Sequence, residues 1–430
     1  MGGLSLPDSK RSHISFYLNR MHLVYANAFL TIVVANKDNA NGGITGYDTC
    51  STGRILPGKV INYPNYVLGM EAVTTLATAS DLPWCSRAWT LQEGFSSRRV
   101  LIIDDRIRLQ CMGDSLEEGS TFGFKFNSNF SDKMLDLQPI LCRASPTERE
   151  PKWWAYSQAA RSFAPRALSY DQDSIKAFLG VINFYTSLDD LQCAVHTRLL
   201  YGHPICMLSR ALLWSSTTAI LERRMLLRPD GSFIMPSWSW MAWRHNRQIT
   251  FSSPLGLGWP TGIYEAKEQI PIVIYAQCGI CMQNHQMTSE KCRNKASPKL
   301  VNPEYLDPYL YIKAQKGHFG VSRDVKESPR EFERDLIYVG TTQKAGIIVG
   351  KVSFDHWPPQ LPRGEAGTLD FIGISYLEGN QFSYHRRPKV EALCVVPVNG
   401  KLGVFERLGV ATILKDAWDQ AAQFDEIILG

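Results

Sequence analysis

In the first part of the chain, segments with apolar residues at helical spacing alternate with short apolar runs. Residues 16–27 carry apolar side chains at helical spacing, and the run FLTIVVA (29–35) that follows is short, β-branched and uncharged. Such a run is typical of a strand buried on both faces of a parallel sheet that helices cover. The polar stretch 36–46 predicts a loop. This order of elements indicates an α/β arrangement.

The same alternation continues to about residue 126. Residues 69–80 fit a helix, Pro83 suits the first turn of the next helix, and Gly94 suits its end. The apolar run 100–111 is interrupted by two aspartates and therefore predicts a hairpin. We group these elements as a first region over residues 1–126.

A mainly helical pattern covers residues 127–250, the second predicted region. The stretch 204–214 predicts an apolar helix, and PSWSWMAW (236–243) is too rich in tryptophan for an ordinary surface loop. Residues 174–188 predict an amphipathic helix whose apolar face is formed by Ile175, Phe178, Leu179 and Ile182.

The third predicted region, residues 251–430, has the short apolar runs of a β-rich structure. The polar stretches 283–300 and 315–335 predict loops, and a short helix fits 415–422. Strands are predicted for the segments 271–280, 310–314, 345–354, 369–377 and 392–398.

Composition excludes several classes of protein. The chain is 44% hydrophobic and 20% charged, which is typical of a globular protein. Its net charge of +5 comes from basic residues that cluster only in pairs, so we expect no nucleic-acid partner. No stretch reaches the ~18 apolar residues of a membrane span. The N-terminal residues lack the apolar core of a secretory signal, so we expect a cytoplasmic protein with reduced cysteines.

Several motifs follow one another in an order that is specific in combination. The segment 20–46 holds Tyr-Ala-Asn-Ala at the end of a helix and then an apolar strand. The box RAWTLQEGFSSRRVLI (87–102) follows, and PSWSW (236–240) and a tail over 405–430 come later. In this order they resemble the fungal heterokaryon-incompatibility (HET) family. The motif positions are Tyr25, Asn27, Arg87, Trp89, Leu91, Gln92, Arg98, Arg99, Trp238 and Trp240.

The front of the chain departs from that family. The resemblance implies a Ser-Tyr-x-Trp-Gly element on a first strand and an Asp with a Cys-Ile pair on the next, and neither is present. We therefore expect an N-terminally truncated member. Because HET domains are distant relatives of TIR domains, the resemblance implies an α/β fold. It would be a truncated TIR-like (flavodoxin-like) parallel sheet with helices, followed by a helical region and a β-rich region.

The resemblance also implies a candidate catalytic residue. Some TIR domains cleave NAD with a glutamate on a helix, and Glu93 is the matching position. A nearby carboxylate can stabilise the oxocarbenium-like state of glycosidic cleavage. On one continuous helix Glu93 lies one turn from Trp89, nearly opposite an apolar stripe of Trp84, Ala88 and Leu91.

A structural role is the alternative for Glu93, in which it pairs with Arg87, Arg98 or Arg99 and orders the domain. The missing front favours this role, because the nucleotide pocket of such a fold needs loops after the first strands. The first hypothesis is therefore a non-catalytic HET-like protein of self/non-self recognition and programmed cell-death signalling. Its partners would be other proteins, or a second copy joined through an exposed sheet edge. A TIR-like NAD hydrolase that uses Glu93 is the second hypothesis.

Two other groups of residues carry candidate chemistry. Cys278, Cys281, His285 and Cys292 are zinc-compatible, but Cys278 ends an apolar run and no second paired motif follows. We therefore expect neither a metal nor a cofactor. The tryptophans at positions 238, 240 and 243 predict a core wedge rather than a ligand cage.

Overall fold

The computed structural model describes part of each predicted region, including the motif positions. The described residues are 20–37, 43–44, 60–69, 82–104, 107–111, 115–117, 149–187, 199–204, 208–216, 221–224, 235–251, 272–278, 284–286, 306–322, 335–339, 347–355, 367–377 and 387–430. The helix predicted over 69–80 lies outside them, apart from Gly69, which ends a strand.

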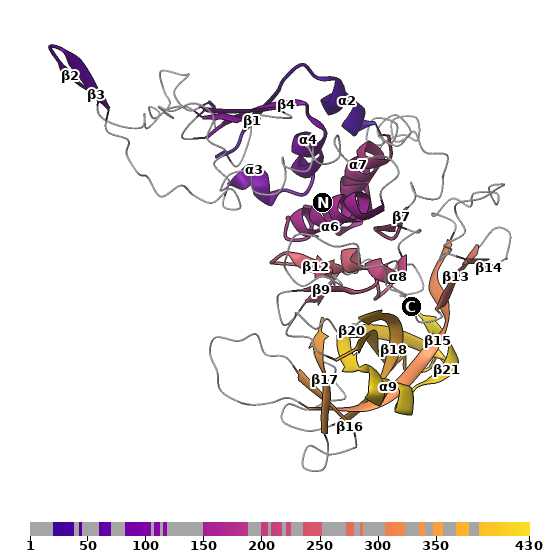
Figure 1. Ribbon diagram of the computed structural model, residues 1–430. Helices are drawn as coiled ribbons and strands as arrows, with labels where there is room; N and C mark the ends of the chain where they lie inside the picture. Colours follow the sequence, from indigo (N-terminus) through magenta and orange to yellow (C-terminus); the bar gives the residue numbers. More distant parts are fainter. Residues whose placement is uncertain are drawn as a thin grey trace. The chain divides into compact units, whose positions relative to one another are not determined.

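Contacts divide the chain into two compact units, Met1–Leu191 (unit 1) and Gln192–Gly430 (unit 2). The division into three regions at residues 126 and 250 stays a prediction. The fold is mixed α/β, with a β-rich C-terminal part (Figure 1). Among the described helices, none is long and apolar enough to cross a membrane.

Unit 1 holds short helices and short strands. Its helices are α2 (Met21–Asn27), α3 (Pro83–Ser86), α4 (Thr90–Ser96), α6 (Arg149–Phe163), the 3-10 helix η3 (Asp171–Asp173) and α7 (Ser174–Ser187). Its strands are β1 (Thr31–Val34), β2 (Val60–Tyr63), β3 (Tyr66–Gly69), β4 (Arg99–Ile103), β5 (Ile107–Cys111) and β6 (Ser115–Glu117).

The sheet of unit 1 has the order β1-β4-β5-β6. Strands β1 and β4 are parallel, with Thr31 opposite Val100, whereas β4–β5 and β5–β6 are antiparallel. The β4–β5 pair confirms the predicted hairpin. The prediction that the first strand is buried on both faces is wrong, because Ile32 is 59% exposed while Val33 is buried. Buried and exposed side chains alternate along β1, as they do in a strand whose sheet has one face open to solvent.

The helix predicted from Pro83 to Gly94 is divided into two short helices. Pro83 begins α3 as predicted, but α3 ends at Ser86, and α4 starts only at Thr90. The backbone between them is extended at Arg87, which bridges to Ala167. The prediction of a single helix across this segment is therefore wrong, and so is its predicted end at Gly94, because α4 runs on to Ser96.

Helix α7 confirms the helix predicted over 174–188, but it buries a different face. Phe178 is buried as predicted, whereas Ile175 is 37% exposed. The buried positions include Ser174, Ala177 and Val181, which follow the spacing of a helix face rotated from the predicted one.

Unit 2 is built mainly of strands. Before the sheet come β7 (Leu199–Leu200), β8 (His203–Pro204), α8 (Leu208–Ala211), β9 (Trp214–Ser216), β10 (Glu222–Arg223), η5 (Trp240–Ala242), β11 (Trp243–Arg244) and β12 (Ile249–Phe251). The sheet itself contains β13 (Val273–Cys278), β14 (Asn284–Gln286), β15 (Leu306–Ser322), β16 (Asp335–Val339), β17 (Ile347–Phe354), β18 (Gly367–Leu377), β19 (Lys389–Pro397), β20 (Val404–Leu414) and β21 (Gln423–Leu429), with α9 (Lys415–Ala421) between the last two.

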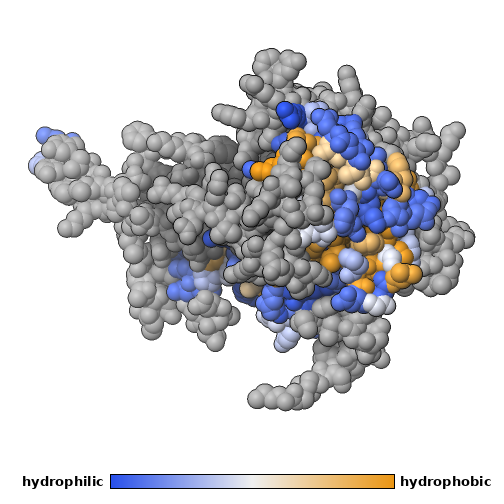
Figure 2. All heavy atoms as spheres, turned by 90° about the horizontal axis from the view of Figure 1, so that it is seen from below, coloured by the Kyte–Doolittle hydropathy of each residue, from blue (hydrophilic) through white to orange (hydrophobic). Residues whose placement is uncertain are grey.

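The strands β15, β16, β17, β20, β19 and β18 close into an antiparallel barrel. Each pairs with the next in this order, and β18 pairs back onto β15, with Lys316 opposite Ile372. Closure removes the free edges that an open sheet would expose. A buried cluster fills the inside, with Phe371 and Cys394 fully buried and Trp418 of α9 among them. Seen from below, hydrophilic and hydrophobic residues lie intermixed on the described surface (Figure 2).

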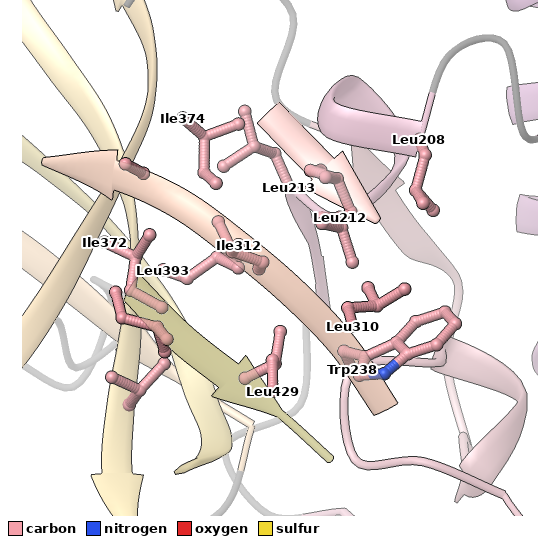
Figure 3. Packing of buried hydrophobic residues seen from close by; sticks show 14 of the residues in the cluster. Leu208, Leu212, Leu213, Trp238, Leu310, Ile312, Ile372, Ile374, Leu393 and Leu429 are labelled. Atoms are coloured by element: carbon pink, nitrogen blue, oxygen red, sulfur yellow. The ribbon is translucent and has the colours of Figure 1, made fainter. Parts of the chain in front are cut away.

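A second buried cluster joins the outside of the barrel to the segments that precede it. Figure 3 shows Leu212 and Leu213 pointing towards Ile312 of β15, with Trp238 against Leu310. The first half of β15 also pairs with β13 and β21. These contacts fix the barrel to the α8–β9 segment and to PSWSW within unit 2.

The strand predictions of the C-terminal part are largely confirmed, by β13, β15, β17, β18 and β19. The predicted loop over 315–335 is wrong at its start, because β15 continues to Ser322. The helix predicted over 204–214 is reduced to the single turn of α8, and Trp214 begins a strand instead. Strand β20 was not predicted.

Candidate functional site

The carboxylate of Glu93 is half-buried in unit 1 and contacts side chains of neighbouring helices. The turn between α3 and α4 reverses the expected geometry, so that Trp84 and Glu93 face each other. The indole Nε1–H of Trp84 donates to Glu93 Oε2 over 3.0 Å. Trp84 is buried, and Glu93 is half-buried. The predicted placement of Glu93 opposite the Trp84 stripe is therefore wrong.

Tyr25 of α2 reaches the same carboxylate. Burial, together with the negative charge and hydrogen bond of Glu93, raises the pKa of Tyr25 to about 12. A phenol beside a carboxylate keeps its proton because a second negative charge there is unfavourable. Glu93 therefore links α2 to α3 and α4, and the motif position Tyr25 meets it there.

Arg166 provides positive charge close to Glu93 from a segment far away in the sequence. It is 7% exposed, and its guanidinium donates to Ser162 O (2.9 Å), Arg87 O (3.0 Å) and Thr90 Oγ1 (3.1 Å). Burial lowers its pKa to about 10, against the opposing effect of the charges of Cys85 and Glu93. Arg166 holds the extended turn between α3 and α4, and nothing in the local sequence marks it for this role.

Gln92 fixes α4 against α7. Its side chain is fully buried, and its Nε2 approaches Met21 Sδ at 4.0 Å. A Cβ added at Gly180 would lie 1.7 Å from Gln92 Oε1. Only glycine at position 180 leaves room for this glutamine, so the motif position Gln92 packs the helices together. Leu91 is also fully buried.

The remaining motif positions of unit 1 are exposed or half-buried. Asn27 is exposed, and its Nδ2 donates to Leu23 O. Arg98 is exposed, and the guanidinium of Arg99 lies 4.9 Å from the centre of the Phe29 ring. Trp89 is half-buried at the start of α4. Within the part of the chain that the structure describes, Glu93 forms no ion pair with Arg87, Arg98 or Arg99, so these arginines do not supply the partner that the structural alternative expected.

The tryptophans of PSWSW lie in the core of unit 2. Trp238 is fully buried, and Trp240 and Trp243 are at most 3% exposed. Their indole groups serve the backbone: Trp238 donates to Pro308 O, and Trp243 donates to Ser237 O. This burial supports the prediction of a core wedge rather than a ligand cage.

A fully buried ion pair lies beside these tryptophans. Arg407 Nε donates to Asp355 Oδ2 over 2.8 Å, and Arg407 Nη1 donates to Leu212 O over 2.7 Å. The Arg407 guanidinium also donates to Trp214 O and lies 3.6 Å from the centre of the Trp214 ring. The sequence does not predict this pair, since neither residue stands in a recognisable local motif.

The zinc-compatible residues Cys281 and Cys292 lie outside the described residues. Among the residues that are described, no group of three or more His, Cys, Asp or Glu side chains could hold a metal ion.

Comparison with known families identifies the part of the chain that contains Glu93. Residues 8–93 match the family model described as Heterokaryon incompatibility protein (HET). The matched segment belongs to the HET family. The match includes Tyr25, Trp84 and Glu93, and it stops before Arg99 and all of unit 2. Neither a curated protein nor a solved structure matches the chain. The HET segment thus carries the Glu93 contacts, and its family suggests a role related to heterokaryon incompatibility.

Proposed function

We propose that this protein acts in fungal self/non-self recognition, leading to programmed cell death, and that it signals through protein contacts rather than by catalysis. The observation that carries the proposal is the use of the Glu93 carboxylate inside the HET segment. It accepts a hydrogen bond from Trp84 and interacts with the hydroxyl group of Tyr25. A carboxylate that joins three helices in this way has an architectural role.

The exposed surface of the same segment supports contacts with other proteins. Phe29 is 81% exposed and Ile32 is 59% exposed at the edge strand of the sheet. Apolar side chains of this size at an open edge are typical of interaction sites. A cytoplasmic location is part of the proposal, and self-association through this edge is the alternative kind of protein contact.

The competing function is a TIR-like NAD hydrolase that uses Glu93. The parallel β1–β4 pair supports a TIR-like relationship, and the aromatic rings of Trp84 and Tyr25 beside a carboxylate are the observation that favours this chemistry. The hydrogen bond from Trp84 counts against it, because it occupies one oxygen of a carboxylate that catalysis needs for its substrate.

Inducible expression of the full chain in a filamentous fungus tests the proposal. We expect growth arrest from the wild-type chain and equal arrest from Glu93→Gln. The glutamine keeps an oxygen acceptor for Trp84 but removes the carboxylate that glycosidic cleavage needs. Protein level and circular dichroism establish that the variant is folded. A folded Glu93→Gln variant that no longer arrests growth, in cells whose NAD falls only with the wild type, would establish the hydrolase instead.

A further inference from the structure

The outer edge of β1 is unpaired among the described strands of unit 1. Strand β1 pairs with β4 on one side, and no other described strand pairs with it. Its uncharged sequence TIVV lacks the lysine or proline with which exposed edges are usually protected against pairing. The edge therefore offers a row of backbone donors and acceptors to an incoming strand.

Exposed apolar side chains accompany this edge. Phe29 and Ile32 are 81% and 59% exposed, and Ile32 lies opposite Leu101 of β4, which lies opposite Leu109 of β5. Leu101 and Leu109 are each partly exposed. This row continues the exposed surface of Ile32 across one face of the sheet, because residues opposite each other on neighbouring strands share a face.

The described residues next to the edge carry basic side chains, and acidic ones are absent from them. The segments 20–37 and 97–103 contain no aspartate or glutamate. Arg99 is exposed beside the start of β1, where its guanidinium lies over Phe29, and Lys37 follows the end of the strand. Asp104, which follows β4, is buried and paired with Arg108, and Asp38, which follows Lys37, lies outside the described residues. The open edge thus has a cation near each end.

We propose that this edge binds an extended segment of a partner protein that carries apolar side chains and carboxylates, which adds to β1 as a further strand. Backbone hydrogen bonds would provide the pairing, Phe29 and Ile32 the apolar contact, and Arg99 a planar donor group for a carboxylate. This inference rests on the proposed function and names the chemistry of the partner.

The observations favour this occupant over two others. An antiparallel pair of two β1 strands from two copies would bring Arg99 of one copy towards Lys37 of the other at both ends of the pair, and like charges there are unfavourable. A lipid surface would leave the backbone groups of the edge without hydrogen bonds, which is costly in an apolar medium.

Fluorescence polarisation with the full-length chain tests the proposal. The probe is a short labelled peptide of alternating valine and glutamate, and the control peptide has lysine at every glutamate. We expect the acidic peptide to bind at least about tenfold more tightly than the basic one, a difference of one decade in Kd. Equal binding of both peptides, or binding of neither, would overturn the proposal.

Variants locate the binding. Ile32→Lys and Arg99→Glu are expected to weaken binding of the acidic peptide about tenfold. Ile348→Lys is the matched control, because Ile348 is also an exposed isoleucine on a strand, at 53%, but lies on β17 of unit 2. Arg99→Glu should in turn favour the basic peptide, a reversal that general damage to the fold would not produce.

Two further measurements decide between occupants. A mass twice that of the monomer in analytical ultracentrifugation, abolished by Ile32→Lys, would replace the proposal with a dimer of this chain. Binding to anionic phosphatidylserine vesicles but not to the acidic peptide would replace it with a membrane surface. Failure of peptide binding leaves the growth-arrest result untouched, so the two accounts can fail separately.

Discussion

At the scale of single residues, Arg407 and Asp355 form a buried ion pair in unit 2. Arg407 and Asp355 are at most 1% exposed, and the guanidinium uses its other donors on backbone carbonyl groups. Removing one member of such a pair leaves the other as an uncompensated buried charge. The pair therefore binds the barrel to the Trp214 segment only as long as both members are present.

Arg407→Met tests this dependence. We expect the free energy of unfolding of unit 2 to fall by about 3–5 kcal/mol, because Asp355 loses its counter-charge and stays buried. Urea unfolding followed by tryptophan fluorescence measures the change. The double variant Arg407→Met/Asp355→Leu should lose less than the single variant, and a larger loss in the double variant would contradict the pairing.

Two buried histidines make the stability of unit 2 depend on pH. Burial lowers the pKa of His203 to about 3 and that of His245 to about 4. Below the unfolded pKa of about 6.5, the unfolded chain binds protons that the folded chain does not, so stability falls as the pH falls. At about pH 5 each histidine should lower the free energy of unfolding by about 2 kcal/mol.

Unfolding at about pH 7.5 and about pH 5 measures this loss. His203→Leu should reduce the loss relative to the wild type, since it removes one of the two groups. A variant whose loss equals that of the wild type would show that His203 is not the source.

At the scale of elements, the break between α3 and α4 decides the geometry of the HET box. The extended turn at Arg87, held by Arg166, brings Trp84 onto Glu93. Helix α4 then packs against α7, where Gln92 occupies the space over Gly180. The box thus orders the helices of the segment through its backbone turn and its buried glutamine.

Gly180→Ala probes this packing. The added methyl group would overlap Gln92 Oε1, and the glutamine is fully buried, so we expect a loss of about 1–3 kcal/mol in the stability of unit 1. Thermal unfolding measures it. The double variant Gly180→Ala/Gln92→Ala should recover part of the loss, whereas additive losses would mean that the two residues do not share this space.

Local pattern predicted the elements whose side chains alternate or repeat regularly. The hairpin of β4 and β5, helix α7 and most barrel strands follow from it. Strand β15 was predicted too short because its second half looks polar. There the inward Gly317 and Phe319 alternate with the outward Lys316 and His318. The pairing of β15 with β18 joins residues far apart in sequence, and no local pattern encodes it.

The candidate site was only half visible in the sequence. The family motif located Glu93, and the match to residues 8–93 confirms the family. Its partners could not be derived, because a periodic helix was assumed across Arg87, where the chain instead turns. Arg166 enters from a distant segment, so its contact with Thr90 depends on tertiary packing alone.

For the whole molecule, the two units should respond separately to substitutions. Met1–Leu191 and Gln192–Gly430 each have their own core, and separate cores unfold as separate cooperative units. Calorimetry of the full chain should show two transitions. Gly180→Ala should lower the transition of unit 1, and Arg407→Met should lower the transition of unit 2. Variants that each shift both transitions equally would contradict this division.

The account assigns the HET segment of unit 1 to recognition and its Glu93 to holding helices together. Release of nicotinamide from NAD by the purified full chain at high protein concentration is the most direct test. The account predicts no release above the buffer background, from the wild type or from Glu93→Gln. Release by the wild-type chain that disappears in a folded Glu93→Gln variant would contradict it.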